Sequence, residues 1–276
     1  MFWFVSMDVM SKYMMQSYPV VQVMWARFFF HLCWVMVFMT IAGQIKIRSN
    51  RPHLQVIRSV LLLGVTFFFF QGINTVQIAT ASVIMFLAPI LVVVLAIPIL
   101  KEKVGIRRGI SVLVGFVGAL VVVRPGMIGF EPGMTFLLVA AFCHAFYLLA
   151  TREVRDIDGP LVSLFYTGAF GAVVTSTIVP FYWVWPAATD WLLFVGIGFF
   201  GSVSHLCLIR AFSAAPASVV APFTYSALLW STSLGYLVFG DLPDRWVMLG
   251  AVLIVASGLY IFFREEALAR QEESSG

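Results

Sequence analysis

The amino-acid sequence predicts an all-α integral membrane protein of ten transmembrane helices, arranged as two inverted five-helix repeats. Apolar residues make up 61% of the 276 residues and charged residues only 11%, against roughly a quarter charged in soluble domains. A bilayer core about 30 Å thick needs roughly 20 mainly apolar residues per spanning helix, so about ten helices fit in the chain. The order of sequence features in the first half of the chain also recurs in the second half.

Apolar runs bounded by polar residues, glycine or proline define the expected spans. In the first half these are Met1–Gln16, Val20–Ala42, Ile57–Val76, Ala79–Leu100 and Arg108–Val123. In the second half they are Gly133–Ala150, Leu161–Trp183, Trp191–Phe212, Ser218–Phe239 and Trp246–Phe263. These runs are longer than the roughly 9 to 11 residues of a barrel strand, which favours helices. The N-terminus has no basic leader or cleavage site, so the first run is expected to remain as a helix.

Lys and Arg residues concentrate in alternate connections, which predicts the orientation, because cytoplasmic loops hold the excess of these residues. With the N-terminus inside, the opposite side holds only Arg124 and Arg245. The inner connections and the tail hold Lys46, Arg48, Arg51, Arg58, Lys101, Lys103, Arg107, Arg108, Arg152, Arg155, Arg210, Arg264 and Arg270. The sequence therefore predicts a multi-pass protein of a bacterial inner membrane with both termini in the cytoplasm.

The repeat is visible as a shared order of short features. Thr80–Val83 (TASV) in the first half recurs as Pro216–Val219 (PASV) in the second half. In both halves the segment is followed, in the same order, by a proline (Pro89 or Pro222), an acidic turn (Glu102 or Asp241), a glycine (Gly118 or Gly258) and an arginine (Arg124 or Arg264). Because five helices is an odd number, the second half enters the membrane in the opposite sense. The expected units are residues 1–126 and 127–263, followed by a solvated and frayed cytoplasmic tail at 264–276. Such inverted repeats are typical of secondary transporters.

Four segments carry a resemblance to a known family. They are Met7-Asp8 to Lys12 with Tyr18-Pro19 and Trp25-Ala26-Arg27; Leu100 to Gly105 running on to Arg124-Pro125-Gly126; Phe165-Tyr166; and Ala217-Ser218 through Phe239-Gly240-Asp241. The sequence resembles the EamA-type members of the drug/metabolite transporter superfamily from about Ser6 to Phe263. The resemblance implies ten helices, alternating access, and export or uptake of metabolites through a cavity lined mainly by the first, third, fourth, sixth, eighth and ninth helices.

Three charged residues lie inside expected spans, where ionisable groups are costly and are by default functional. Asp8 and Lys12 have the i, i+4 spacing of an ion pair on one helical face. Arg27 lies at a similar depth on the next helix, at about 1.5 Å rise per residue on either side of the turn at Pro19. Asp8 can therefore pair with either cation, leaving one positive charge free. We expect the three to form one cluster facing a central cavity; a static structural ion cluster is the alternative.

The other candidates for substrate binding or coupling are polar or aromatic residues in apolar runs. On the expected sixth helix, His144 and Tyr147 form a polar stripe with Thr151. His205 lies in the middle of the eighth helix, Gln71 and Asn74 end the third, and Tyr225 and Trp230 follow the proline of the ninth. His31, four residues after Arg27, ranks below them. For each of these residues, hydrogen bonding or packing between neighbouring helices remains the alternative.

The sequence favours a transporter over other classes of protein. Gly196–Gly201 (GIGFFG) matches a dinucleotide fingerprint in letters only, since it has no preceding strand, and the glycines favour close helix packing. The three cysteines have no metal-site spacing. No cofactor, metal or nucleic acid is expected, and the grouped acids or nucleophile of a membrane-embedded enzyme are missing. The expected partners are the lipid bilayer and a small-molecule substrate; a homodimer is left open.

The substrate classes stay open at this point. Amino acids and related zwitterions such as S-adenosylmethionine come first, because a spare cation near Asp8 suits a carboxylate. Vitamins or nucleoside-like rings and lipophilic organic cations are the alternatives. The direction of transport, its energy coupling and a start upstream of Met1 also remain open.

Overall fold

The computed structural model describes residues 1–43, 47–100, 106–124, 131–154, 158–214 and 221–275, and the described chain contains helices but no strands. The first half comprises α1 (Phe2–Met14), α2 (Val20–Ile41), α3 (Pro52–Ile73), α4 (Ile78–Met85), α5 (Leu87–Leu100) and α6 (Ile106–Val123). The second comprises α7 (Gly133–Val154), α8 (Pro160–Ile178), η1 (Val179–Tyr182), α9 (Asp190–Ala214), η2 (Ala221–Tyr225), α11 (Ser226–Phe239) and α12 (Arg245–Ser275). Each predicted span coincides with one helix or with two consecutive helical segments.

Five of the described helices are long and apolar enough to cross a membrane. They lie at Val20–Ile41, Pro52–Ile73, Gly133–Thr151, Pro160–Tyr182 and Asp190–Leu208. Shorter apolar helices at Ile78–Val92, Gly109–Val123 and Arg245–Tyr260 accompany them. These helices confirm the predicted all-helical class, and their number is that of a multi-pass membrane protein.

Proline explains why the fourth predicted span is two helices. Pro89 has no backbone N–H, and its ring would crowd the carbonyl of Met85, four residues earlier. Helix α4 ends at Met85, and α5 begins at Leu87. The ninth span opens with the 3₁₀ turn η2, which contains Pro222. Both predicted proline positions therefore interrupt regular α-helix.

The predicted tail differs from the observed one, because α12 continues to Ser275 rather than fraying after Phe263. The sequence of this segment is rich in Glu, Ala, Leu and Arg, all of which are good helix formers. Helix propensity therefore carries the last helix beyond its apolar part.

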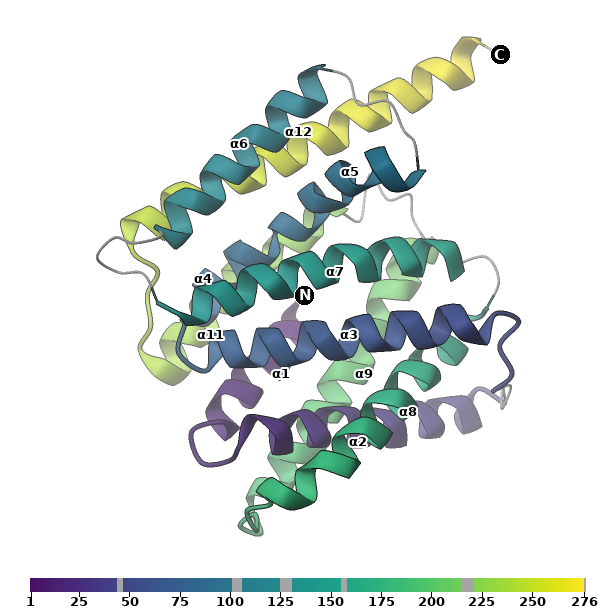
Figure 1. Ribbon diagram of the computed structural model, residues 1–276, viewed down its shortest axis with the longest axis vertical. Helices are drawn as coiled ribbons and strands as arrows, with labels where there is room; N and C mark the ends of the chain where they lie inside the picture. The colour runs from purple at the N-terminus through teal and green to yellow at the C-terminus, as the bar shows by residue number, and fades with distance from the viewer. Residues whose placement is uncertain (44–46, 101–105, 125–130, 155–157, 215–220, 276) are drawn as a thin grey trace.

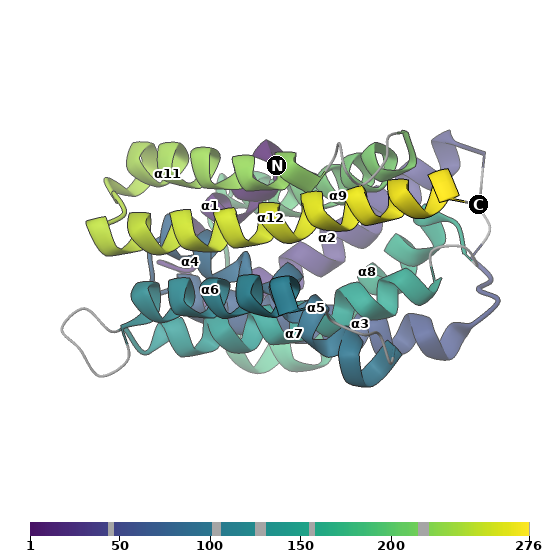
Figure 2. The same ribbon diagram turned by 90° about the horizontal axis from the view of Figure 1, so that it is seen from above.

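The helices form a layered bundle in which α6 and α12 lie along one edge and α2 and α8 along the opposite edge (Figure 1). In between, α3 packs against α7, while α9 packs against α1 and α2. Figure 2 shows the bundle from above, with α11 and α12 on one side and α3 and α7 on the other. We name the two ends of the bundle after their connections. The α1–α2 end carries residues 15–19, 183–189 and 240–244, and the α2–α3 end carries residues 47–51 and 158–159.

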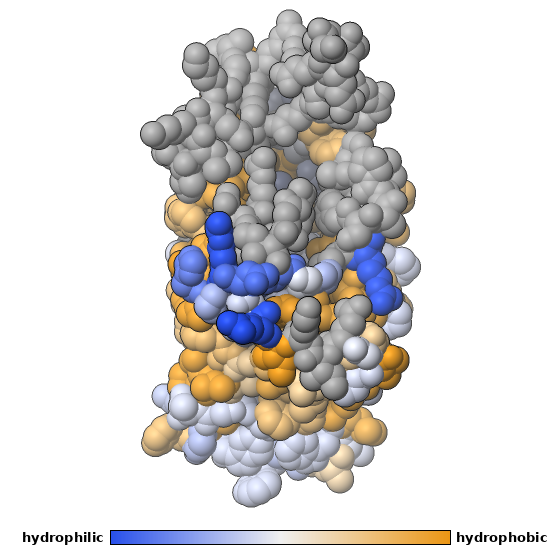
Figure 3. Space-filling view, turned by 90° about the vertical axis from the view of Figure 1, so that its right-hand side faces the viewer, coloured by the Kyte–Doolittle hydropathy of each residue, from blue (hydrophilic) through white to orange (hydrophobic). Residues whose placement is uncertain are grey.

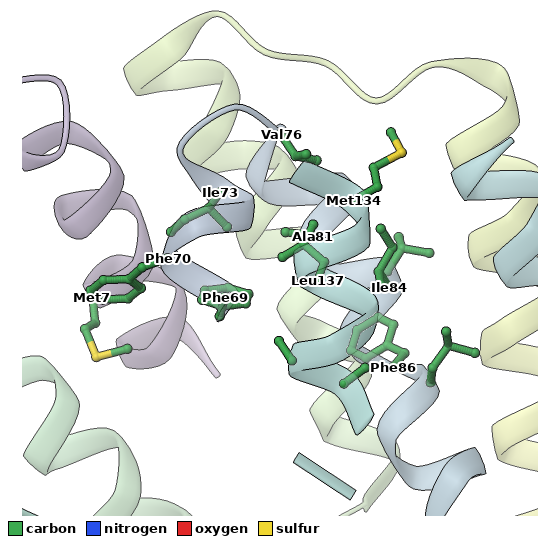
Figure 4. Packing of buried hydrophobic residues seen from close by; sticks show 14 of the residues in the cluster. Met7, Phe69, Phe70, Ile73, Val76, Ala81, Ile84, Phe86, Met134 and Leu137 are labelled. Atoms are coloured by element: carbon green, nitrogen blue, oxygen red, sulfur yellow. The ribbon is translucent and has the colours of Figure 1, made fainter. Parts of the chain in front are cut away.

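The core is apolar and is shared by both halves of the chain. Around α3 and α4 it contains Phe70, Ile73 and Ile84, all fully buried, together with Leu137 of α7. Figure 4 shows Met7 of α1 beside Phe70, and Leu137 beside Ala81 and Ile84. Residues of α1, α3, α4 and α7 thus interlock, which fixes the depth of polar residues on these helices.

Two glycines allow α8 and α9 to approach α2 closely at His31. A Cβ atom on Gly168 would lie 2.9 Å from Cδ2 of His31, and one on Gly198 would lie 2.7 Å from its backbone nitrogen. A larger residue at position 198 would overlap the backbone of α2, and one at position 168 would displace the imidazole of His31. The glycines of the GIGFFG segment therefore include one used for close helix packing, as predicted.

Candidate functional site

A small cavity lies among α2, α3, α7, α8 and α9, and we term it the central cavity. Its volume open to water is about 10 Å³, enough for about one water molecule. Its lining contains no acidic residue and consists of Arg27, Phe28, His31, Leu62, Tyr147, Leu164, Thr167, Gly201 and His205. The polar lining groups are therefore cationic or neutral.

Arg27 is the charged residue of this lining. It is 9% exposed, and its guanidinium lies over the rings of Phe28 and Phe70, at 5.7 and 5.5 Å from their centroids. Among the described residues the guanidinium has no hydrogen bond or ion pair; Asp8 acts on it only through the electrostatic field. Ring faces attract a cation but leave its five N–H donors without acceptors. Arg27 is thus available to an anionic group that enters the cavity.

His31 and His205 add two further unpaired nitrogens. Nε2 of each ring is buried and has no hydrogen-bond partner within the described chain. The ring of His31 lies near the backbone of Leu164, and its Nδ1 lies 3.0 Å from Oγ of Ser202 on α9. The two imidazole centroids are 6.1 Å apart. Because buried polar atoms are nearly always paired in folded proteins, these nitrogens indicate a site for a polar ligand.

Tyr147 is held in the lining by Arg58 of α3. Nη2 of Arg58 donates to the Tyr147 hydroxyl at 2.8 Å, and the guanidinium also lies over the tyrosine ring, 5.0 Å from its centroid. Nε of Arg58 donates to Thr151 at 2.8 Å, and Nη1 donates to the Ser163 carbonyl at 3.1 Å. Because the tyrosine oxygen accepts from Arg58, its own proton remains available to a ligand.

At the α2–α3 end, Asp158 closes the space between the start of α3 and the start of α8. Its carboxylate accepts hydrogen bonds from the Ser49 hydroxyl, from the Asn50 backbone N–H at 3.0 Å and from Nε2 of Gln55 at 2.9 Å. Burial alone would raise the pKa of Asp158, but these three donors together hold its pKa below the ordinary value. We term this cluster the Asp158 latch. Figure 3 views this end, where hydrophilic side chains gather across the surface.

At the α1–α2 end, Tyr18 and Gln22 close the opposite side of the bundle. The Tyr18 hydroxyl donates to the Asp190 carboxylate at 2.6 Å and accepts from the Ala187 backbone N–H at 3.2 Å. Gln22 is fully buried and makes two hydrogen bonds with the backbone of Val184, of 2.7 and 2.9 Å. We term this cluster the Tyr18 latch. It joins the start of α2 to the connection before α9.

Lys12 lies at the same end and is paired differently from the expected cluster with Asp8. Its Nζ donates to the Val76 carbonyl at 2.9 Å and lies 3.4 Å from the Asp241 carboxylate. Within the described residues, Asp8 makes no ion pair with Lys12 or with Arg27. Helix α1 ends two residues after Lys12, which places the ammonium among the connections instead of beside the cavity.

The structure brings Arg27, Tyr147 and His205 of the predicted residues together in the central cavity. His144 stacks on Tyr147 at a centroid distance of 5.9 Å, and its Nδ1 is buried without a partner among the described atoms. His144 therefore contacts the lining residue Tyr147 but does not itself line the central cavity.

The remaining candidates lie elsewhere. Asn74 is exposed at the end of α3, Gln71 is half-buried, Tyr225 packs on Phe86 with ring centroids 5.0 Å apart, and Trp230 packs on Phe2 at 5.1 Å. None of these four lines the central cavity.

Arg58 and His31 are the functional residues that sequence reasoning ranked too low. Arg58 was assigned to a cytoplasmic connection, but α3 begins at Pro52, and Arg58 is 2% exposed. The proline at the first helical position was the available signal for an earlier start. For His31 the signal was its position one helical turn after Arg27, which places both on one face of α2.

The chain is similar to known proteins over nearly its whole length. The model of the EamA-like transporter family matches residues 1–124 and 131–263. A protein of Rickettsia prowazekii named as an S-adenosylmethionine uptake transporter is 30% identical over 97% of this chain and 91% of its own length.

Two further relatives transport other compounds according to their names. A riboflavin transporter of Vibrio cholerae is 31% identical over 63% of this chain and 59% of its own length. A pseudopaline exporter of Pseudomonas aeruginosa is 25% identical over 93% of this chain and 90% of its own length. One solved crystal structure matches with a TM-score of 0.65 at 20% identity, covering 99% of this chain and 97% of that one. At that identity the match supports the fold alone.

Proposed function

The chain belongs to the EamA-like transporter family, and from this membership we propose that it is a secondary transporter of S-adenosylmethionine or a closely related zwitterion. The observation that carries the proposal is the unpaired Arg27 guanidinium in a buried cavity with the Nε2 atoms of His31 and His205. S-Adenosylmethionine has an amino-acid head group, whose carboxylate would satisfy the donors of Arg27. The name of the Rickettsia prowazekii relative supports this substrate.

We further propose ten membrane spans arranged as two inverted repeats, in a bacterial inner membrane. The packing of the helices supports the repeat, because exchanging each helix for its counterpart five spans later preserves the contacts. The contact of α3 with α7 corresponds to the contact of α9 with α1. In the same way, the contact of α3 with α8 corresponds to that of α9 with α2, and the contact of α4 with α7 corresponds to that of α11 with α1. The pairs α2 with α8 and α6 with α12 exchange into themselves and are also in contact.

The two latches support alternating access as the mechanism. Tyr18 belongs to the first half of the chain and contacts Asp190 of the second, whereas Asp158 belongs to the second half and contacts Gln55 of the first. Both latches are closed, and the cavity between them has room for about one water molecule. This is the arrangement expected of a carrier that is closed toward both sides of the membrane. Opening one latch at a time would expose the cavity to one side of the membrane.

The test is transport by the purified protein in proteoliposomes. Uptake of radiolabelled S-adenosylmethionine should saturate, and unlabelled S-adenosylmethionine should inhibit it more strongly than methionine or tetraethylammonium. Preloading the vesicles with unlabelled substrate should accelerate uptake if the carrier exchanges substrates. Background-level uptake of S-adenosylmethionine in vesicles that contain monodisperse protein would refute the substrate assignment.

Riboflavin is the second candidate, favoured by the Vibrio cholerae relative. It lacks the carboxylate that Arg27 would bind, so Arg27→Gln should spare riboflavin transport. Adding labelled riboflavin to the same vesicles distinguishes the two substrates.

A further inference from the structure

A second cavity lies beside the central one and is bounded by the start of α1, the later part of α9 and the segment η2–α11. Its volume open to water is about 270 Å³, close to the lower end of the roughly 300–1,000 Å³ typical of ligand pockets. Its lining includes the aromatic residues Trp3, Phe4 and Phe223 and the hydroxyls of Ser204, Thr224 and Ser226. We term it the vestibule.

The vestibule and the central cavity adjoin at two aromatic rings in contact. Phe4 lines the vestibule, His205 lines the central cavity, and their ring centroids are 4.9 Å apart in an edge-to-face contact. Ser204, the residue before His205, also faces the vestibule.

The hydroxyl groups of the vestibule are oriented by the helices that carry them. Ser204 donates its proton to the Gly201 carbonyl at 2.8 Å, and Ser226 donates to the Phe223 carbonyl at 2.6 Å. A hydroxyl that donates in this way keeps its oxygen lone pairs as acceptors. The two serines therefore favour a ligand with N–H or amino groups at the edge of an otherwise apolar body.

We propose that the vestibule binds the planar nitrogen heteroaromatic ring of the transported substrate, with an exocyclic amine or ring N–H directed at Ser204 and Ser226. The inference rests on the proposed function, since it places the head group of the same substrate at Arg27. Trp3, Phe4 and Phe223 supply the ring faces and edges on which such a ring stacks. Phe4 and His205 are in contact where the ring site adjoins the head-group site.

The volumes and the lining agree with this division. The central cavity, with room for about one water molecule, is too small for a ring system, whereas the vestibule is large enough for a purine. A lipid acyl chain, the other occupant to consider at this depth, would use the apolar walls but would leave the serine acceptors unpaired.

The experiment uses two fragments of S-adenosylmethionine as probes. Adenosine carries the ring without the amino-acid head, and S-methylmethionine carries the head and its sulfonium without the ring. Binding of each to the purified, detergent-solubilised full chain is measured by equilibrium dialysis with labelled probe, which requires no transport. The variants are Trp3→Ala and Ser226→Ala; the matched control is Trp34→Ala, because Trp34 packs on Phe199 at a centroid distance of 4.9 Å and lines neither cavity.

We expect Trp3→Ala to weaken adenosine binding about tenfold, as is typical when one stacking ring is lost. Ser226→Ala should weaken adenosine more than a purine riboside without the amine, and both variants should leave S-methylmethionine unchanged. Trp34→Ala should change neither probe. Equal weakening of both probes, or no weakening of adenosine in either monodisperse variant, would overturn the inference. A phospholipid that copurifies with the wild type, is lost in Trp3→Ala and is not displaced by adenosine would also overturn it, in favour of an acyl-chain site.

These experiments test the proposed function and the ring site independently. If S-adenosylmethionine is not transported but adenosine binds in a Trp3-dependent manner, the substrate assignment fails and the ring site stands. If S-adenosylmethionine is transported equally well by Trp3→Ala and the wild type, the ring site fails and the transporter assignment stands.

Discussion

A buried arginine without acceptors is costly, because transfer of a charge from water into an apolar interior needs compensating hydrogen bonds. Arg27 has two aromatic rings and the field of Asp8 as compensation, but no acceptor among the described residues. Arg58, by contrast, has partners on α3, α7 and α8. We therefore assign a binding role to Arg27 and a positioning role to Arg58.

Arg27→Gln should raise the KM for S-adenosylmethionine on the order of ten- to a hundredfold, because one charge-assisted contact contributes about 1.5–3 kcal/mol. The matched control is Arg124→Gln, which removes an arginine paired with Asp244 at the surface, at a distance of 2.6 Å. The measurement is initial uptake rate per monodisperse protein. Equal KM values for the two variants would exclude Arg27 from substrate binding.

Asp158 links pH to stability at the α2–α3 end. Its pKa in the folded protein is lowered because its three hydrogen-bond donors outweigh burial. A carboxyl with a lowered folded pKa stabilises the folded state above its unfolded pKa of about 3.9. This stabilisation is lost as the pH falls through the lower folded value.

Asp158→Asn should therefore lower the melting temperature by a few degrees at pH 7, and the difference from the wild type should shrink below about pH 4. Glu131→Gln is the control of opposite sign, since burial raises the pKa of Glu131 and its neutral replacement should not destabilise the protein at pH 7. Differential scanning fluorimetry in detergent measures both. A difference for Asp158→Asn that stays constant down to pH 3 would contradict the assignment.

At the residue scale, the sequence identified cavity residues correctly where their depth in a membrane-spanning segment was sufficient to predict them. Arg27 and His205 were selected because they lie in the middle of apolar runs, and both line the cavity. Lys12 was grouped with Asp8 from i, i+4 spacing, but its long side chain reaches Val76 and Asp241. Those partners are distant in sequence, so no local pattern could reveal them.

At the scale of elements, the two latches are built alike. In each latch, the turn before the second helix of one half is hydrogen-bonded to the third helix of the other half and to the connection that precedes that third helix. Pro19 directly follows Tyr18 and precedes α2, and Pro160 lies two residues after Asp158 and opens α8, so each turn contains a proline close to its latch residue. The sequence analysis identified the turn at Pro19 and the approximate helix positions, but not Pro160 or the partners across the bundle.

Loosening one latch should open the cavity toward one side only. Single-cysteine reporters at Leu62→Cys, in a background without Cys33, Cys143 and Cys207, measure this with an impermeant thiol reagent added to either side of the membrane. Tyr18→Phe should increase labelling from the α1–α2 side, and Asp158→Asn from the α2–α3 side, each by about fivefold for the loss of about 1 kcal/mol. The control Tyr13→Phe changes a half-exposed tyrosine of α1 and should change neither rate. An increase from the same side in both variants would contradict reciprocal latches.

At the scale of the whole molecule, the positions of the helical segments were predicted from run length, because an apolar stretch of about 20 residues spans one bilayer thickness. The relative placement of the helices did not follow, since apolar helices in lipid associate by shape and hydrogen bonding instead of hydrophobic burial. Gly168 and Gly198 illustrate this, because their close approaches to α2 depend on α8 and α9 meeting the same turn of that helix.

The orientation of the molecule is the remaining whole-molecule prediction. The α2–α3 end has exposed Arg48 and Arg51, and the connections predicted on the same side also contain Lys46, Lys101 and Lys103. The other end has Arg124, which is paired with Asp244, and exposed Arg245. The excess of positive charge belongs in the cytoplasm, so the α1–α2 end should face outward.

Single cysteines at Ala188 and Asn50 test this orientation, because both positions are exposed and lie at opposite ends. In whole cells an impermeant thiol reagent should label Ala188→Cys and Glu131→Cys but not Asn50→Cys; a cysteine at Asp156, which lies outside the described residues, should behave like Asn50→Cys. Permeabilised cells provide the control, since every position should then react. Labelling of Asn50→Cys in intact cells would reverse the orientation, and with it the assignment of the Tyr18 latch to the outer side.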